Sequence, residues 1–267
     1  MPRFILILSL VFLTCASKSG DIIIAGSTSV QPFIEKLAEE FMAKNPKIKI
    51  NVQGGGSTAG IQAVFNRTCD IGTSSRNLHP SEQGLNVYLM AMDGIAIIVH
   101  PTNPLNNLTH EELREIFAGR IKNWKEVGGP DKEIFAVTRE EGSGTRGAFE
   151  ELIMHGTPIS DACLVQDSNG AIREIIANTP QAIGYISAGL VNERVKALSI
   201  DSIAPTIENY KNGRYKFLRP FLLLTIERPQ GVVKSFIDYL LSDTAQKILQ
   251  HEGLIPAKIL NNEREGF

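Results

Sequence analysis

The feature that most constrains the fold is a repeated change of hydrophobic period, from short apolar runs to helical spacing. The run DIIIAG, residues 21–26, is typical of a buried strand, and Phe33, Leu37 and Phe41 then recur at every fourth position. The Asn-Pro pair at residues 45–46 predicts the end of that helix. Because such strand–helix units follow one another along the chain, the sequence predicts an α/β architecture with mostly parallel sheets.

The same alternation continues to the end of the chain. Further strands are predicted at residues 47–53, 94–101, 133–139 and 182–187, and further helices at 59–66, 109–117, 146–156, 168–180 and within 229–253. No Gly/Ser-rich or Pro-rich linker separates two halves, as expected for a chain that crosses between halves more than once. The strand at 94–101 and the apolar run 215–225, which Pro220 interrupts, are the candidate crossings.

The first twenty residues differ from the rest. Arg3 precedes an apolar run from Phe4 to Leu13, which is too short to span a bilayer and is typical of a secretory leader. The alternative is a buried N-terminal strand or helix. Cys15 resembles the lipid-modified cysteine of bacterial lipoproteins, although cleavage near residues 17–20 without lipidation stays open. We therefore expect export to the periplasm or the outer face of the cell membrane.

Composition limits the classes of function. The 267 residues are 43% hydrophobic, which is enough for a sizeable core in one or two domains. A net charge of −2 argues against a broad nucleic-acid-binding face, so any anion site has to be local. Once a leader is removed, Cys69 and Cys163 remain, and the sequence does not decide between a disulfide and simple packing.

Four loops share one composition. Three of them connect a predicted strand to a predicted helix and are rich in glycine and hydroxyl side chains, and the fourth places serines beside an arginine. They are GSTS at residues 26–29, GGGST at 54–58, TSSR at 73–76 and REEGSGT at 139–145. In open α/β sheets, such loops gather at the carboxyl ends of the strands, where ligands bind.

The chemistry of these loops suits a small oxyanion. The first turn of a helix leaves backbone N–H groups unpaired and carries partial positive charge. Glycines let the backbone approach closely, hydroxyls add donors, and arginine adds a planar charged fork. Ordinary helix capping by Ser and Thr explains any single loop. It does not explain the combination of all four, so we predict an anion-binding site.

Motifs for catalysis or metal binding are missing. The GGGSTAG run lacks the lysine of a phosphate-binding P-loop, and neither Ser57 nor Ser143 lies in a G-x-S-x-G elbow. The five histidines have no paired ligand spacing. We therefore expect no enzymatic activity, no metal and no cofactor.

Taken in order, GSTSVQPF, GGGSTAGI, DIGTSSR and REEGSGTRGAF resemble the phosphate-binding component of bacterial phosphate ABC transporters, as do IFAGRIKNWKEVGG and AIGYIS. The similarity runs from about Ile22 to the C-terminus. It implies a type II periplasmic-binding-protein fold of two lobes, each a mixed, mostly parallel sheet flanked by helices. With residues 1–20 as the leader, lobe I is expected to comprise 21–98 plus 223–267, and lobe II 99–222.

The resemblance also implies a set of ligand-binding residues around phosphate. By position they are Thr28, Ser29, Ser57, Ser75, Arg76, Arg139, Ser143, Gly144 and Thr145. Glu141 lies where the family often has an aspartate that orients the arginine, here Arg139. Ser75 departs from the aspartate that many members use to accept the proton of hydrogen phosphate, so discrimination against sulfate is left open. Arg76 is expected to face the cleft and add charge.

The resemblance implies capture of inorganic phosphate and delivery to an ABC permease by a protein expected to be monomeric. Other tetrahedral oxyanions, namely sulfate, molybdate and tungstate, are the alternatives within the same class. An exported phosphate sensor or a phosphotransfer enzyme would be a different class, and the second lacks an obvious nucleophile–base pair.

Overall fold

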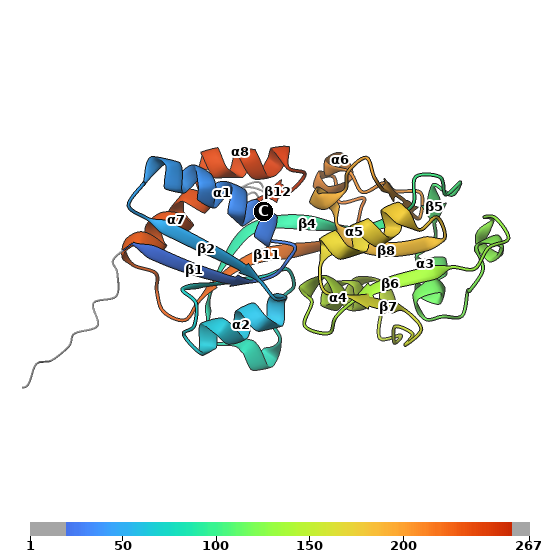
Figure 1. The fold of residues 1–267 in the computed structure, drawn as a ribbon, viewed down its shortest axis with the longest axis horizontal. Coiled ribbons are helices and arrows are strands. Elements are labelled where there is room, and N and C mark those ends of the chain that lie inside the picture. Colours follow the sequence, from blue (N-terminus) through green and yellow to red (C-terminus); the bar gives the residue numbers. More distant parts are fainter. Residues whose placement is uncertain (1–19, 258–267) are drawn as a thin grey trace, which may run out of the picture.

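The computed structural model describes residues 20–257 and shows two packed halves joined by two long strands (Figure 1). Cys15 and the rest of the predicted leader lie outside the described residues. Within residues 20–257, none of the helices is long and apolar enough to cross a bilayer.

The first half is built on three parallel strands. β1 (Asp21–Gly26) lies between β2 (Lys49–Gly54) and β3 (Ile71–Ser74); the apolar runs predicted β1 and β2, whereas β3 falls in a segment predicted as a loop. Helices α1 (Gln31–Lys44) and α2 (Ser57–Phe65) make the connections. Because the strands are parallel, the loops after β1, β2 and β3 all meet at the same edge of the sheet.

The second half repeats this arrangement. β6 (Phe135–Arg139) pairs in parallel with β7 (Leu164–Gln166) and with β8 (Ala182–Ser187). The helical segments between these strands are α4 (Gly144–Phe149), which continues as a π-helix at Glu150–Met154, and α5 (Asn169–Asn178). The loop after β6 therefore opens directly into a helix, as the sequence predicted.

Two long antiparallel strands connect the halves. β4 (Asn86–Val99) pairs with β11 (Leu218–Thr225), with a register shift between Phe221 and Leu222. β4 continues into pairing with β8, while β11 pairs with β3, so one sheet runs in the order β2-β1-β3-β11-β4-β8-β6-β7. Pro220 is tolerated because β11 acquires its second neighbour only from Leu222 onward.

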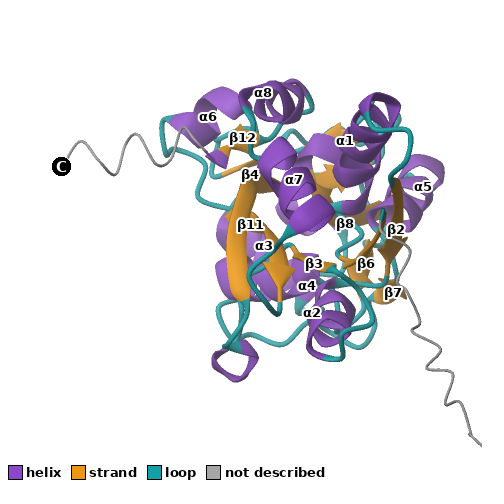
Figure 2. Ribbon diagram, turned by 90° about the vertical axis from the view of Figure 1, so that its left-hand side faces the viewer, coloured by secondary structure: helices purple, strands orange, loops and turns teal. Residues whose placement is uncertain are grey.

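The remaining elements complete the two halves. They are β5 (Asn107–Leu108), α3 (His110–Phe117), β9 (Lys196–Ala197), β10 (Ser199–Ile200), α6 (Ile207–Lys211), α7 (Gly231–Leu240), α8 (Asp243–His251) and β12 (Ile255–Pro256), with 3₁₀ turns at Pro80–Glu82, Trp124–Val127 and Ala188–Leu190. Thr109 caps α3 as predicted, since its hydroxyl accepts from the backbone N–H of Glu112. Figure 2 shows α1, α7 and α8 on one side of the first half's sheet and α2 on the other.

The two crossing strands pass from the hydrophobic core of the first half into that of the second half. Met90 and Ala91 of β4 pack in the first half's core with Phe221, whereas Ile95 packs in the second half's core with Phe217. We therefore propose that the lobes divide near residues 92–94 and 218–220, a few residues before the expected boundaries. Here we call the part containing β1 lobe I and the part containing β6 lobe II.

The two cysteines are free thiols in different places. Cys163 is buried in the core of lobe II, and Cys69 is partly buried against a smaller apolar cluster of lobe I. Burial raises the pKa of each thiol to about 11. The disulfide left open by the sequence is therefore not formed.

Candidate functional site

The hydroxyl-rich loops of the two lobes contact each other. The Ser29 Oγ, after β1, lies 2.8 Å from the Thr145 Oγ1 at the start of α4. The Thr58 backbone N–H donates to the Gly142 carbonyl across the same boundary at 3.1 Å. The loops that the sequence analysis grouped together thus converge between the lobes.

Lobe I contributes a compact group of buried serines. The Ser75 backbone N–H donates to the Ser57 Oγ at 3.0 Å, and the Ser27 Oγ donates to the Ser75 Oγ at 2.8 Å. All three side chains are buried. The loops after β1, β2 and β3 are therefore linked through their hydroxyls.

Lobe II contributes the start of α4. The Ser143 Oγ caps this helix by accepting from the backbone N–H groups of Thr145 and Arg146, at 3.2 and 3.3 Å. Gly144 allows a close approach, because a Cβ at that position would lie 2.1 Å from the Ser57 Oγ. Only glycine leaves room there for the lobe I hydroxyls.

Arg139 bridges the lobes. Its Nη2 donates to the Thr28 Oγ1 at 3.1 Å and to the Asp167 carbonyl at 3.0 Å. Its Nε and Nη2 also bind the carboxylate of Glu140, at 2.9 and 2.8 Å. The orienting carboxylate is thus Glu140 and not the expected Glu141, which is exposed.

The third guanidinium nitrogen of Arg139 is buried without a partner among the described residues. Arg139 is 1% exposed, and its buried Nη1 has no hydrogen-bond partner. A buried N–H without a partner is costly, and an anion would supply one.

Arg76 lies differently from the expectation. Both of its Nη atoms donate to the carboxylate of Glu82, at 2.7 and 2.8 Å, and Nη2 also donates to the Thr58 Oγ1 at 3.2 Å. This hydrogen bond from Arg76 lowers the pKa of Glu82 below its ordinary value. The guanidinium of Arg76 therefore points to Glu82, although it was expected to face the cleft.

Sequence analysis missed a third arginine at the center of the site. Arg219, on β11, donates to hydroxyls from three loops: to Thr145 Oγ1 at 2.7 Å, Ser29 Oγ at 3.1 Å and Ser75 Oγ at 3.2 Å. It also forms a fully buried ion pair with Asp93 of β4, from Nη2 to Oδ2 at 2.9 Å. Both residues interrupt apolar strand segments, MAMDGIAII and KFLRPFLLL, and an isolated charge in such a segment is the signal that could have revealed them.

Both carboxylate oxygens of Asp93 accept hydrogen bonds. Its Oδ1 accepts from the Ser187 Oγ at 2.9 Å, while the Nε and Nη2 of Arg219 bind its Oδ2. Burial raises the pKa of Asp93, and the charge of Arg219 opposes that rise. The pair fixes Arg219 where the two lobes and both crossing strands meet.

Asn169, the first residue of α5, was also missed. Its Nδ2 donates to the Ser29 Oγ at 2.9 Å and its Oδ1 accepts from the Ser187 backbone N–H at 3.1 Å. Nothing in the local sequence marks this asparagine as different from an ordinary helix start.

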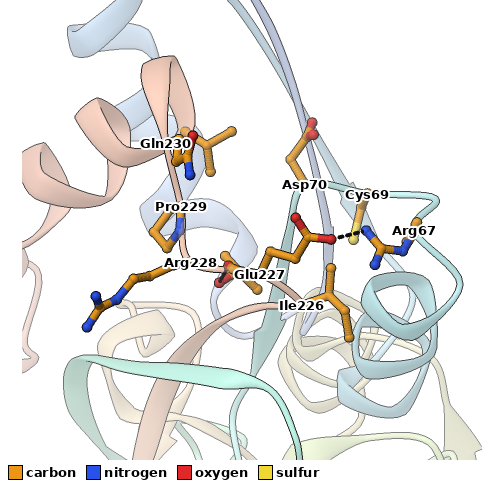
Figure 3. A pocket seen from close by; sticks show the side chains of 10 residues that line it. Arg67, Cys69, Asp70, Ile226, Glu227, Arg228, Pro229 and Gln230 are labelled. Carbon is orange, nitrogen blue, oxygen red and sulfur yellow. Dashed lines mark hydrogen bonds and ion pairs between the residues drawn. The ribbon is translucent and has the colours of Figure 1, made fainter.

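One other pocket on the described part of the surface has a different lining. A separate pocket of about 360 Å³, lined by Arg67, Cys69, Asp70 and residues 225–230, with Val233, lies at the opposite end of β3 from Ser75 (Figure 3). There Arg67 pairs with Glu227 on the surface, at 2.6 Å. Among residues 20–257, no group of His, Cys, Asp and Glu is arranged to hold a metal ion.

Comparison with known proteins agrees with this geometry. A family model of the PBP superfamily domain matches residues 14–244. The phosphate-binding protein PstS of Bacillus subtilis (strain 168) is 36% identical over 253 residues, covering 92% of this chain and 84% of the relative. The PstS of Borreliella burgdorferi is 30% identical over 271 residues, covering 96% and 97%.

Solved structures give the same result. A phosphate ABC transporter substrate-binding protein from Clostridium perfringens, with bound phosphate, has a TM-score of 0.86 at 40% identity, covering 89% of this chain and all of that one. An ABC-type phosphate transport receptor from Vibrio cholerae has a TM-score of 0.73, also at 40% identity, covering 88% and 99%.

The two-lobed fold with its interlobe hydroxyl site is therefore that of a periplasmic-binding-protein-like domain. Within that superfamily, this chain belongs to the family of the phosphate-binding proteins PstS.

Proposed function

We propose that this protein captures inorganic phosphate between its lobes and delivers it to the permease of an ABC transporter. The observation that carries the proposal is the interlobe contact between Ser29 and Thr145, beside the unpartnered Nη1 of Arg139. Donors from both lobes converge there, so a tetrahedral anion can hold the lobes together.

The contacts support a proposed ligand-binding set. All members are buried or line the interlobe contact, and each offers a hydroxyl, an N–H or a guanidinium group. They are Thr28, Ser29, Ser57, Ser75, Arg139, Ser143, Gly144 and Thr145. Arg76 is left outside this set because Glu82 and Thr58 occupy its guanidinium.

Binding requires that phosphate replace contacts that the lobes now make with each other. Hydrogen bonds to a charged group contribute roughly 1.5–3 kcal/mol each, so a handful exceeds the roughly 8 kcal/mol of a micromolar complex. The excess offsets the removal of water from the anion and the ordering of the lobes. No bond is broken, and hinge closure couples ligand occupancy to recognition by the permease.

Calorimetry tests the proposal. Protein unfolded and refolded to remove bound ligand is titrated with phosphate and molybdate. We expect tight one-to-one binding of phosphate and weaker binding of the larger anion. Absence of heat with phosphate would overturn the proposal, and tighter binding of molybdate would favour the alternative oxyanion class. Phosphate uptake by cells lacking the gene then distinguishes delivery from sensing.

The same proposal includes the cellular location. We propose that the protein is exported, is anchored through a lipid on Cys15, and acts as a monomer facing the permease. Intact mass of protein from the native membrane distinguishes a lipidated N-terminal cysteine from cleavage near residues 17–20. Sedimentation of the soluble fragment from Gly20 onward measures the oligomeric state.

A further inference from the structure

The hydroxyl groups of the site are hydrogen-bonded in a way that fixes the direction of their protons. A hydroxyl has one proton to donate and two lone pairs that accept. The Ser75 Oγ accepts from the Ser27 Oγ at 2.8 Å and from the Arg219 Nη1 at 3.2 Å. Both lone pairs of Ser75 are therefore occupied, so the Ser75 Oγ can only donate, and its proton points to the Ser57 Oγ at 3.5 Å.

Ser29 and Thr145 are fixed in the same way. The Ser29 Oγ accepts from the Nη2 of Arg219 at 3.1 Å and from the Nδ2 of Asn169 at 2.9 Å. Its proton is therefore donated to the Thr145 Oγ1, which lies 2.8 Å away. The Thr145 Oγ1 accepts from the Nη1 of Arg219 at 2.7 Å, and its contact with Ser29 fills the second lone pair.

Ser143 completes the pattern on lobe II, because its Oγ accepts from two backbone N–H groups. Ser57 accepts from the backbone N–H and the hydroxyl of Ser75, whereas Thr28 accepts one bond, from Arg139, and keeps one free lone pair. A hydroxyl with a free lone pair can either donate or accept, and it does not force a ligand to carry a proton.

Three carboxylates near the site are each paired with an arginine. Asp93 binds Arg219, Glu140 binds Arg139, and Glu82 binds Arg76. Hydrogen phosphate carries one P–OH group and sulfate carries none. A site that rejects sulfate needs an acceptor that cannot turn into a donor, and Ser75 does not supply one here.

We infer that Arg219, held in place by Asp93, is a specificity-determining residue: it fills lone pairs of Ser29, Ser75 and Thr145, so that none of them can accept the proton of hydrogen phosphate, and it thereby makes the site tolerant of unprotonated oxyanions such as sulfate. This inference rests on the proposed function, because it concerns which tetrahedral anions the phosphate site accepts. Arg219 acts by positioning the protons of these hydroxyls.

The first test is the ratio of two affinities in the unaltered protein, measured at pH 7 by calorimetry with phosphate and with sulfate. Sites built around a required hydrogen-bonding group reject an analogue lacking it by roughly 10⁴- to 10⁵-fold. We expect sulfate to bind less than about 100-fold more weakly than phosphate, since one flexible hydrogen bond separates the two ligands. Rejection of sulfate by about 10⁴-fold or more would overturn the inference and leave phosphate binding intact.

The second test changes the positioning pair without leaving a buried charge. In the double variant Arg219→Met with Asp93→Leu, the hydroxyls regain free lone pairs. We expect sulfate to lose at least about 10-fold more affinity than phosphate, because the freed lone pairs can accept from the P–OH group of phosphate, which sulfate lacks. Equal losses of the two affinities, or none, would contradict the inference.

A third variant leaves the ion pair between Arg219 and Asp93 in place. Ser75→Asp introduces an acceptor that cannot donate, so the affinity for sulfate should fall further than the affinity for phosphate. Retained sulfate binding would count against the inference. The phosphate titration of the unaltered protein judges the proposed function separately: a protein that binds no phosphate refutes that function, whereas one that binds phosphate and excludes sulfate refutes only the role of Arg219.

Discussion

Arg139 and Glu140 are neighbours in sequence, and their side chains nevertheless form a two-point ion pair, with Nη2 2.8 Å from Oε1 and Nε 2.9 Å from Oε2. Arg139 is 1% exposed, whereas the side chain of Glu140 is 30% exposed. The pair therefore aims the guanidinium inward, toward Thr28, while its countercharge reaches the solvent.

Removal of this countercharge should destabilise the ligand-free protein. In Glu140→Gln, the buried guanidinium loses its charged partner, and such losses cost roughly 3–5 kcal/mol when both groups are buried. Because Glu140 is partly exposed, we expect the substitution to lower the free energy of unfolding by about 1–3 kcal/mol, measured by urea unfolding without phosphate. Bound phosphate then supplies a countercharge, so the stabilisation by saturating phosphate should exceed that of the unaltered protein.

Glu141→Gln is the matched control, since Glu141 is exposed and does not contact Arg139. Its stability should change by less than about 0.5 kcal/mol. Equal effects of the two substitutions would show that Glu140 does not orient the arginine.

The ion pair between Arg76 and Glu82 gives a pH-dependent prediction. The pKa of Glu82 is lowered from an ordinary value near 4.5, with the hydrogen bond from Arg76 as the main cause. An acid with a lowered pKa stabilises the fold above its unfolded pKa, and this contribution is lost as the pH falls through the folded value. Glu82→Gln should therefore be less stable than the unaltered protein by about 3 kcal/mol at pH 7, since both partners are largely buried.

The difference should shrink as the pH falls below about 4.5, where Glu82 takes up a proton in the unfolded chain, and it should be lost once the pH has also passed the lowered pKa of the folded protein. Urea unfolding of both proteins from pH 7 to pH 3 measures this difference in stability. A stability gap that is independent of pH would mean that the substitution acts through packing and not through charge.

The two thiols should be unreactive in the folded protein. Burial raises the pKa of Cys69 and of Cys163 to about 11, and the thiolate is the reactive form. At pH 7.5, iodoacetamide should modify each at least about 100-fold more slowly than in urea, judged by mass spectrometry of timed samples. Rapid modification of Cys163 in native buffer would show that the core of lobe II opens readily.

Much of the fold follows from local sequence patterns. The run 21–26 forms β1 as expected, and the four-residue spacing of Phe33, Leu37 and Phe41 places all three on the buried face of α1. These elements follow from periodicity alone, because one face of each is buried and the other meets solvent. The loops after β1, β2 and β3 converge because these parallel strands end at the same edge, and the loop after β6 meets them from the opposite lobe.

The missed residues depend on long-range pairing. Arg219 meets Asp93 across 126 positions of sequence, and Asn169 meets Ser29 across 140. Neither contact leaves a trace in local spacing. The choice of Glu140 over Glu141 depends on the direction in which the backbone leaves β6, which two adjacent glutamates in a sequence do not reveal.

At the start of α4, Gly144 of lobe II lies close to two serines of lobe I. In Gly144→Ala, the added Cβ would lie 2.1 Å from the Ser57 Oγ and 2.6 Å from the Ser75 Oγ, which belong to the opposite lobe. The backbone of Gly144 is helical, so alanine introduces no strain within lobe II itself. The substitution should therefore hinder closure of the lobes on phosphate and leave the folding of each lobe unchanged.

Overpacking of this kind costs roughly 1–3 kcal/mol, so calorimetry should show phosphate affinity reduced about 10- to 100-fold. Gly142→Ala is the control on the same loop, because its added Cβ would meet only the Thr58 Cβ, at an ordinary 3.8 Å. We expect that variant to bind phosphate within about 3-fold of the unaltered protein, which corresponds to the small effect typical of an uncrowded surface position. If both alanines weakened binding equally, loop flexibility rather than the approach of Gly144 to Ser57 would control closure.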